Sequence, residues 1–201
     1  MATDSTVAKT KLRALNARIL FAHGLRKASA LEDGGTPKYG VCLVFDTAAQ
    51  KDPAFKALRA AVNEKVGEIV GVPQNKIRTP FRSSDDEEKT GQPGFEPGSL
   101  FINVSSKDKP LVVDQARNEL SDDEIKARVL SGYYVNALLG IYTYGADANA
   151  RKKTKGNAGV AFGLQAVQLV RKGDVLSGRA SASDFDAIET TEGEDVEELL
   201  S

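Results

Sequence analysis

Apolar and β-branched residues recur along the chain in short runs that predict β-strands. Residues 11–22 alternate loosely before an Ile-Leu-Phe run, and residues 39–45 are almost wholly apolar; a turn-rich loop separates the two, so they are expected to pair. The strongest strand patterns are residues 133–144 and 159–170, which are rich in aromatic and β-branched residues and are expected to form an antiparallel pair. Shorter strands are expected at residues 99–104 and 111–114.

One long helix and one short helix are also predicted. Asp52 is a good helix-capping residue, and Pro53 suits the first helical position. Apolar residues then recur at helical spacing until a Gly-Val-Pro sequence ends the pattern, and this stripe is expected to lie on a sheet: Phe55, Leu58, Val62, Val66 and Ile69. Ser121 and Glu124 form a capping-box pattern, which predicts a short helix through about residue 129.

The order of these elements favours a fold that is mainly β with added helices. Strand and helix do not alternate regularly, so a small antiparallel barrel or an α+β sheet of about five strands is expected rather than a doubly wound fold. Gly140 inside a strand is expected to mark a bulge or bend. Residues 74–98 are rich in Pro and Gly late on, which predicts a long excursion outside the core. A single domain over residues 1–176 is expected, followed by a linker and a disordered acidic tail over residues 177–201.

Charge is separated along the chain. Residues 184–201 carry eight acidic side chains and no basic one, whereas the preceding residues carry all 27 Lys and Arg against 20 Asp and Glu. A basic body attracts polyanions, and an acidic tail can occupy the same surface or recruit a basic protein. A tail of this kind can equally be a solvated terminus that only aids solubility. The charge pattern therefore favours nucleic acid as the ligand but does not decide the matter alone.

The reactive side chains argue against most enzymes. His23 is the only histidine and Cys42 the only cysteine, which leaves too few ligands for a structural zinc site and no internal disulfide. Neither common Gly-rich phosphate-binding motif occurs, and no cofactor is expected. Cys42 is expected to pack as a small hydrophobe in a reducing cytoplasm. No segment has the pattern of a signal peptide or a membrane span, so a cytoplasmic protein is expected.

Aromatic residues of one predicted strand lie next to the densest cationic cluster of the chain. With a two-residue period, Tyr134, Tyr142 and Tyr144 share one strand face, and Tyr133 lies on the other. The loop that follows contains four cations: Arg151, Lys152, Lys153 and Lys155. Single-stranded nucleic acid exposes both phosphates and base faces, so rings beside cations suit it. The alternative is that the tyrosines are half-buried core residues and the loop is a solvated hairpin tip.

Positive charge also lies elsewhere in the chain. Arg78 and Arg82 flank Phe81, an arrangement that suits base stacking combined with phosphate pairing. Lys107 and Lys109 lie in a predicted turn between two short strands. These residues are weaker candidates for nucleic-acid contacts than the tyrosine strand and its loop.

An acidic run at residues 85–88 supports a rival interpretation. Asp85, Asp86 and Glu88 could bind Mg²⁺ in a nuclease. Metal sites of that type usually draw their carboxylates from separate elements, whereas four in a row inside a loop suit a solvated tip. A third interpretation is a structural interaction protein whose tyrosines pack a protein interface.

The chain resembles a family of single-stranded-DNA-binding proteins of tailed bacteriophages in the order and spacing of five segments: PKYGVCLVFD, RTPFRSSDDEE, GSLFINVSSKDKPLVVD, SGYYVNALLGIYTY and GVAFGLQAVQLVRKGDVLSGR. The resemblance covers about residues 11–185. It implies a five-stranded oligonucleotide/oligosaccharide-binding barrel (OB-fold) elaborated by the long helix, and a role in DNA replication or recombination in the infected bacterial cell. The implied activity is binding without catalysis, with the groove at strand 133–144 and its basic loop.

The acidic tail is expected to compete with DNA for this groove and to recruit a replication protein such as a polymerase or helicase. Tails of single-stranded-DNA-binding proteins often end in an aromatic residue, whereas this chain ends in Leu-Leu-Ser and has its only tail aromatic, Phe185, near the start. No membrane partner is expected, and a homodimer is left open. The tail residues expected to contact a partner are Phe185, Asp186, Glu194, Asp195, Glu197, Glu198, Leu199 and Leu200.

Overall fold

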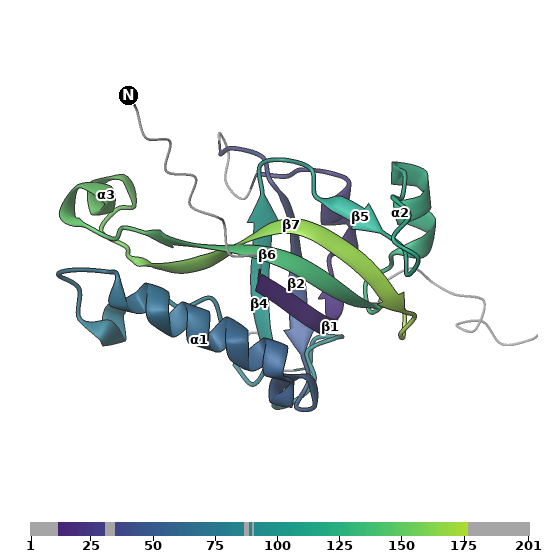
Figure 1. The fold of residues 1–201 in the computed structure, drawn as a ribbon, viewed down its shortest axis with the longest axis horizontal. Coiled ribbons are helices and arrows are strands. Elements are labelled where there is room, and N and C mark those ends of the chain that lie inside the picture. Colours follow the sequence, from purple (N-terminus) through teal and green to yellow (C-terminus); the bar gives the residue numbers. More distant parts are fainter. Residues whose placement is uncertain (1–11, 31–34, 87–88, 90, 177–201) are drawn as a thin grey trace, which may run out of the picture.

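The computed structural model describes residues 12–30, 35–86, 89 and 91–176. Within them the fold is mainly β, with helices on its periphery (Figure 1). The strands are β1 (Leu12–Leu20), β2 (Tyr39–Phe45), β3 (Arg82–Ser83), β4 (Leu100–Ser106), β5 (Leu111–Val113), β6 (Tyr134–Tyr144) and β7 (Gly159–Arg171). The α-helices are α1 (Pro53–Gly67), α2 (Asp122–Arg128) and α3 (Ala148–Lys153), and single 3-10 turns lie at Ala22–Leu25, Ala49–Lys51 and Gln74–Lys76.

The strands form one sheet in the order β3-β4-β2-β1-β6-β7-β5, with an additional pairing between β4 and β7. The predicted antiparallel pairs β1–β2 and β6–β7 are confirmed. The sheet has seven strands rather than about five. The two-residue β3 at one edge was not predicted, whereas the three-residue β5 at the other edge matches the expected strand at residues 111–114. Following the pairings β1–β2–β4–β7–β6 leads back to β1, since β6 also pairs with β1.

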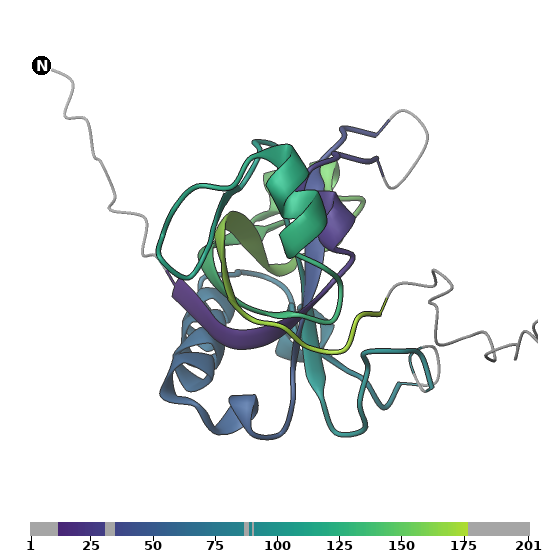
Figure 2. The same ribbon diagram turned by 90° about the vertical axis from the view of Figure 1, so that its right-hand side faces the viewer.

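Helix α1 begins as predicted and ends earlier. The Asp52 carboxylate accepts a hydrogen bond from the Ala54 backbone N–H at 2.7 Å, and Pro53 occupies the first helical position. Phe55, Leu58 and Val62 are buried against the strands, so the predicted stripe is confirmed there. The helix ends at Gly67. Ile69, which lies in the turn after the helix, is also buried. Figure 2, viewed from the α2 end, shows α1 along one side of the strands.

Helices α2 and α3 lie at opposite ends of the fold (Figure 1). The predicted capping box of α2 is confirmed, because the Ser121 side chain accepts from the Glu124 N–H and the Glu124 carboxylate accepts from the Ser121 N–H. Helix α3 was not predicted. It occupies the tip of the long β6–β7 hairpin, which extends beyond the rest of the sheet.

Two hydrophobic clusters stabilise the fold. The main core joins the strands to α1 and includes Ile19, Leu43, Ile102 and Phe162. A second cluster, the outer cluster, lies on the opposite face of β1, β2 and β4 and consists of Leu20, Cys42, Val44, Phe95 and Phe101, with Leu176 packed against it. The prediction that Cys42 packs as a hydrophobe is confirmed, and burial raises the pKa of its thiol to about 12.

The outer cluster corrects one expectation about the excursion at residues 74–98. Phe95 is buried, with its ring centroid 5.1 Å from that of Phe101, so part of the excursion belongs to a core. Arg18 of β1 helps to hold the segment around Phe95 against the sheet, because its guanidinium lies 3.3 Å from the Glu96 carboxylate. The same guanidinium lies 3.8 Å from the Asp174 carboxylate. The last described residue, Leu176, therefore lies on the outer face of the sheet.

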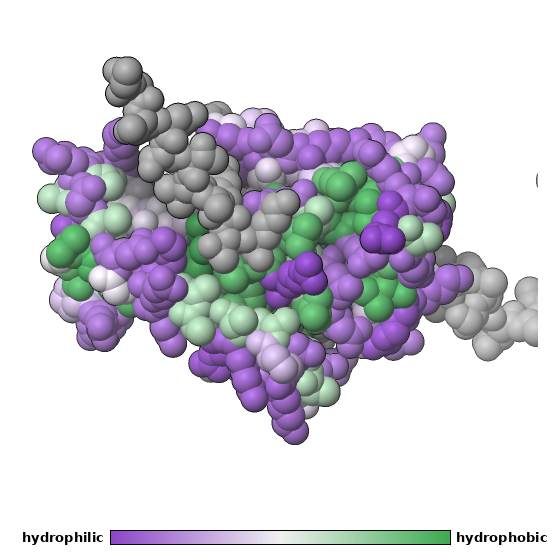
Figure 3. Space-filling view, in the orientation of Figure 1, coloured by the Kyte–Doolittle hydropathy of each residue, from purple (hydrophilic) through white to green (hydrophobic). Residues whose placement is uncertain are grey.

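The surface on the side shown in Figure 1 is mixed. Hydrophobic patches lie mostly toward the middle of this face, and hydrophilic side chains separate and surround them (Figure 3). No helix among the described residues is both long enough and apolar enough to cross a membrane.

Candidate nucleic-acid interface

The strand register aligns four small residues across the outer face of the fold. Gly40 of β2 pairs with Ser105 of β4, Ser105 pairs with Gly163 of β7, and Gly163 pairs with Gly140 of β6. Their sequence neighbours Val41, Val104, Phe162, Leu164 and Leu139 are buried in the main core, so these four residues face outward. We call them the small-residue row. Three glycines and a serine leave the backbone open to the close approach of a ligand.

Tyr142 lies along one side of this row. Its side chain is 46% exposed, and a Cβ atom placed on Gly163 would be only 3.8 Å from Cε1 of the tyrosine ring. Partial burial, with a smaller contribution from Tyr144, raises the pKa of the Tyr142 hydroxyl, which stays neutral at physiological pH. Gln165 lies near the row from the other direction, with its amide nitrogen 3.1 Å from the Cβ position of Gly140. An exposed ring and an amide thus border the row.

Tyr144 continues the same face toward the hairpin tip. Its hydroxyl lies over Gly159, at 2.5 Å from the Cβ position of that glycine, and the Arg78 carbonyl is equally close. Arg78 pairs with Gly159 through a parallel bridge, so the segment after α1 runs alongside the start of β7. The structure therefore brings Tyr144 and the Arg78 backbone together next to the α3 tip, two residues along β6 from Tyr142.

The cationic loop is a short helix with two kinds of cation. The Asp147 carboxylate caps α3 by accepting from the Asn149 and Ala150 N–H groups at 2.8 and 2.9 Å, and these bonds lower its pKa. Arg151 is half-buried and donates to the carbonyls of Val70 and Gly145, so it fastens α3 to the segment after α1. The cations exposed at the tip are Lys152, Lys153 and Lys155.

The other two predicted tyrosines lie elsewhere. Tyr133 is 8% exposed and belongs to the main core, so its ring has no face for a base, and we leave it out of the interface. Tyr134 is at the far end of β6 from Tyr144, and the Arg171 guanidinium stacks 3.3 Å from its ring centroid. The predicted common face for Tyr134, Tyr142 and Tyr144 exists, but only the latter two are close together.

Phe81 and Arg82 line a separate cleft. The Phe81 ring packs edge-on against Phe55 and Phe162, at centroid distances of 5.4 and 6.0 Å, so its predicted role in base stacking does not fit this position. A hollow of about 260 Å³ opens beside it between α1 and β3; we call it the α1–β3 cleft. It is lined by Arg59, Val62, Asn63, Thr79, Phe81, Arg82, Ser83 and Leu100.

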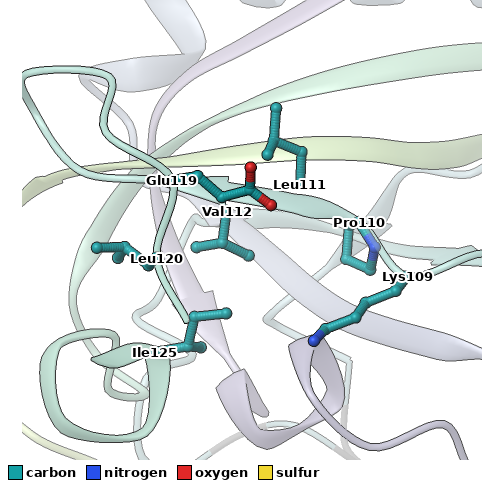
Figure 4. A pocket seen from close by; sticks show the side chains of 7 residues that line it. All are labelled: Lys109, Pro110, Leu111, Val112, Glu119, Leu120 and Ile125. Atoms are coloured by element: carbon teal, nitrogen blue, oxygen red, sulfur yellow. The ribbon is translucent and has the colours of Figure 1, made fainter. Parts of the chain in front are cut away.

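The two predicted turn lysines differ in their surroundings. Lys107 is exposed just beyond β4. Lys109 forms an ion pair with Asp122 at the start of α2. It also lines a hollow of about 190 Å³ between β5 and α2, whose other walls are mainly apolar (Figure 4): Pro110, Leu111, Val112, Glu119, Leu120 and Ile125. The pairing with Asp122 makes Lys109 a weaker candidate for a phosphate contact than Lys107.

The acidic run of the excursion has a structural role at its first residue. The Asp85 carboxylate accepts hydrogen bonds from the Gly98 N–H at 2.8 Å and from the Ser83 hydroxyl at 3.3 Å, which joins the two ends of the loop. The described part of the chain contains no group of three or more His, Cys, Asp or Glu side chains placed to hold a metal ion. Glu88 and the whole predicted partner-binding tail lie outside the described residues.

The small-residue row could not be read from the sequence, because it depends on how distant strands align. Only Gly140 stood out, as the expected site of a bulge. The β6–β7 register does shift there, between Leu138 and Leu139, but Gly140 itself is paired, and Gln165 opposite lies within the shift. Gly163 and Gly40 carried no signal beyond being small residues within predicted strands, and Ser105 lay just beyond the expected strand 99–104, whereas β4 continues to Ser106.

The chain is similar to known phage proteins. A putative protein p50 of Acyrthosiphon pisum secondary endosymbiont phage 1 is 27% identical over 198 residues, covering 92% of this chain and 98% of the relative. The single-stranded DNA-binding protein from bacteriophage Enc34, solved in complex with ssDNA, superimposes with a TM-score of 0.66 at 18% identity, over 82% of this chain and 88% of that one. A C-terminal truncation of the same protein gives 0.65 at 18% identity, over 81% and 86%.

The family model described as Enterobacter phage Enc34, ssDNA-binding protein, matches residues 10–197. The match takes in all described strands and helices and most of the acidic tail, and it confirms the resemblance to phage single-stranded-DNA-binding proteins. The chain therefore belongs to the family of the Enterobacter phage Enc34 ssDNA-binding protein.

Proposed function

We propose that this protein binds single-stranded DNA, largely without regard to sequence, and that the strand crosses the small-residue row. The observation that carries the proposal is the row itself, an open strip of backbone over four strands with the exposed ring of Tyr142 beside it. Every base has a π face, and stacking on a ring contributes roughly 1–3 kcal/mol per base whatever the sequence. Duplex DNA buries those faces.

Within this proposal, β1, β2, β4, β6 and β7 act as the five strands of an OB-fold barrel, and residues 1–176 form the DNA-binding domain. OB-folds bind oligonucleotides on the face of their second and third strands, which here are β2 and β4. The small-residue row begins on these two strands. The proposed path and the usual OB-fold path therefore share β2 and β4.

Cations at both ends of the row suit the DNA backbone. Lys38 and Lys107 are exposed just beyond the last β2–β4 pair, Tyr39 with Ser106. The lysines of the α3 tip lie at the end of the hairpin that carries Tyr142 and Tyr144. A DNA strand that crosses the row would thus meet positive charge at both ends of the row: near the ends of β2 and β4, and at the α3 tip beyond Tyr144.

We place this activity in phage DNA replication or recombination in the cytoplasm of the infected cell, as binding without catalysis. The acidic tail is proposed to compete with DNA and, once displaced, to recruit a replication protein. Two observations support the competition: the tail follows Leu176, which lies on the outer face, and the tail carries eight carboxylates. A chain ending at residue 183 should bind DNA more tightly, and unchanged affinity would remove the tail from the proposal.

The test of function is a titration of the full-length protein against labelled oligo-dT and a duplex of equal length. Oligo-dT should bind clearly more tightly. If four to six phosphates are neutralised, log affinity should fall against log salt with a slope of about −3 to −4. Equal binding of the duplex, or a flat salt dependence, would contradict the proposal. The same mixtures with Mg²⁺ or Mn²⁺ test the rival nuclease, which requires cleavage of the labelled strand.

A further inference from the structure

Two phenylalanine or tyrosine rings are strongly exposed in the described part of the chain. Tyr142, which borders the small-residue row, is 46% exposed, and Phe21, just after β1, is 52% exposed. The other phenylalanine and tyrosine side chains of the described residues are buried or half-buried. Phe21 therefore resembles Tyr142 in exposure and adds little to either hydrophobic cluster.

The backbone of Phe21 has a conformation that rarely suits a large side chain. Its φ and ψ angles are 58° and 40°, in the left-handed region, where glycine and asparagine are favoured and bulky residues are uncommon. Two hydrogen bonds hold this bend: the Gly24 N–H donates to the Phe21 carbonyl at 2.9 Å, and the Ala22 N–H donates to the Ser131 hydroxyl at 3.1 Å. Neither backbone conformation nor packing favours a phenylalanine here, so the exposed ring in a strained segment indicates a role in binding.

The turn that follows Phe21 lies at the Gly40 end of the small-residue row. Strand β1 pairs with β2 on the side away from β4, and the 3-10 turn Ala22–Leu25 comes directly after β1. Gly24 of this turn lies against the Gly40 backbone so closely that a side chain on Gly24 would have no room. The turn therefore takes the place of β1 beside Gly40, and Phe21 lies just beyond the end of the row.

Phe21 and His23 form a ring pair on the exposed side of the turn. Ala22 and Leu25 belong to the main core, whereas the side chains of Phe21 and His23 are exposed. The two ring centroids are 6.4 Å apart, and the ring planes meet at 85°. An edge-on contact of this kind covers at most one face of either ring. A base can therefore stack on the face of Phe21 that His23 leaves free.

Positive charge accompanies this ring pair. Lys27 and Lys38 are exposed on the two arms of the loop between β1 and β2, which are joined by the backbone pair of Ser29 with Lys38. The described residues of these arms, 22–30 and 35–38, include no acidic side chain. Exposed rings with lysines nearby are the combination that single-stranded DNA requires, because rings hold bases and cations hold phosphates.

We propose that Phe21, with His23 beside it, is a second stacking site for single-stranded DNA, beyond the Gly40 end of the small-residue row. This inference rests on the proposed function and adds a base contact to it. From the turn to Gly163, which lies next to Tyr142, there are three strand spacings of about 4.8 Å, or roughly 14 Å. The two rings therefore hold different bases of one DNA strand, and the stretch between those bases crosses the row.

The first experiment measures the oligo-dT affinity of full-length variants at a fixed, moderate salt concentration. Phe21→Ala and Phe21→Leu should each raise Kd about fivefold, the lower end of what one stacked base contributes, whereas Phe21→Tyr keeps the ring and should bind like the wild type. Val175→Ala is the matched control, because it truncates an apolar side chain that is 47% exposed but is not a ring. Unchanged affinity in Phe21→Ala or Phe21→Leu, or an equal loss in Val175→Ala, would overturn the second stacking site.

Thermal unfolding without DNA separates a binding role of Phe21 from a structural one. Phe21→Asn suits the left-handed backbone, so it should unfold at no lower temperature than the wild type while it loses as much affinity as Phe21→Ala. A purely structural Phe21 would instead lower the unfolding temperature and the affinity together, and that result would overturn the proposal.

The last experiment combines Phe21→Ala with Tyr142→Ala. Rings that hold different bases should have independent effects, so a fivefold loss and a tenfold loss should multiply to about fiftyfold in the double variant. A double variant that loses no more than Tyr142→Ala would show that the rings share one base, and the second site would be overturned. A protein that binds oligo-dT but does not respond to Phe21→Ala keeps the proposed function and loses the second site, whereas a protein that ignores oligo-dT loses both.

Discussion

Replacing Tyr142 with alanine should weaken binding of single-stranded DNA more than any other single aromatic substitution on the outer face. Tyr142 is the exposed ring that borders the small-residue row, near Gly163. Removing it takes away the stacking surface but leaves the cations and the open backbone in place. The fold should survive, because 46% of the side chain already faces solvent.

The size of the effect follows from how much of the ring is available. A fully stacked base contributes roughly 1–3 kcal/mol. Since about half of Tyr142 is already covered by its own strand neighbours, the loss should lie in the lower half of that range, which corresponds to a roughly tenfold increase in Kd. Tyr142→Phe keeps the ring and should change Kd little.

The assay is fluorescence anisotropy of labelled oligo-dT with the full-length protein at a fixed, moderate salt concentration. Tyr134→Ala is the matched control on the same strand, since that ring is covered by Arg171. Thermal unfolding of each variant checks that the fold is intact. An unchanged Kd for a folded Tyr142→Ala protein, or an equal loss in Tyr134→Ala, would refute the reasoning about the row.

Three further predictions concern the row and the scaffold. Gly163→Ala should fold and bind nearly normally, since its Cβ would lie 3.8 Å from the Tyr142 ring and 3.9 Å from the Ser105 carbonyl. Gly163→Leu should obstruct the row and abolish tight oligo-dT binding. Normal binding by the leucine variant would argue against the proposed DNA path. Cys42 should resist a thiol reagent at pH 8 until the protein is unfolded, and because its folded pKa of about 12 exceeds the unfolded 9.0, the free energy of unfolding should fall as pH rises through that window. Asp52→Ala should lower the free energy of unfolding in urea by about 1 kcal/mol, and Asp52→Asn should cost much less.

Local patterns were enough to predict most elements. The expected strands 39–45 and 133–144 match β2 and β6 to within a residue, and the capping signals of α1 and α2 are present as hydrogen bonds. These features depend on neighbouring residues, so the sequence contains the information directly. Helix α3 was not predicted, because its lysines suggested only a charged loop. Asp147, which caps the helix, is nevertheless a typical helix-start residue.

The candidate site was only partly predictable, because it depends on contacts between distant segments. The sequence placed Tyr142 and Tyr144 on one strand face beside the cationic tip, and the structure agrees. It could not show that Gly40, Ser105 and Gly163 align, since register between strands is set by long-range pairing. The packing of Phe81 and Phe95 was not predicted for the same reason. Both residues lie in segments that were expected to be loops, and contacts with distant parts of the chain cover their rings.

The most direct test of the central claim is photocrosslinking of the full-length protein to an oligonucleotide that carries 5-iodouracil, with the adducts mapped by mass spectrometry. The account predicts adducts at Tyr142 and on neighbouring peptides of the small-residue row from β4 and β7. Adducts confined to other aromatics, such as the exposed Phe21 after β1, with none on the β6–β7 hairpin, would contradict it.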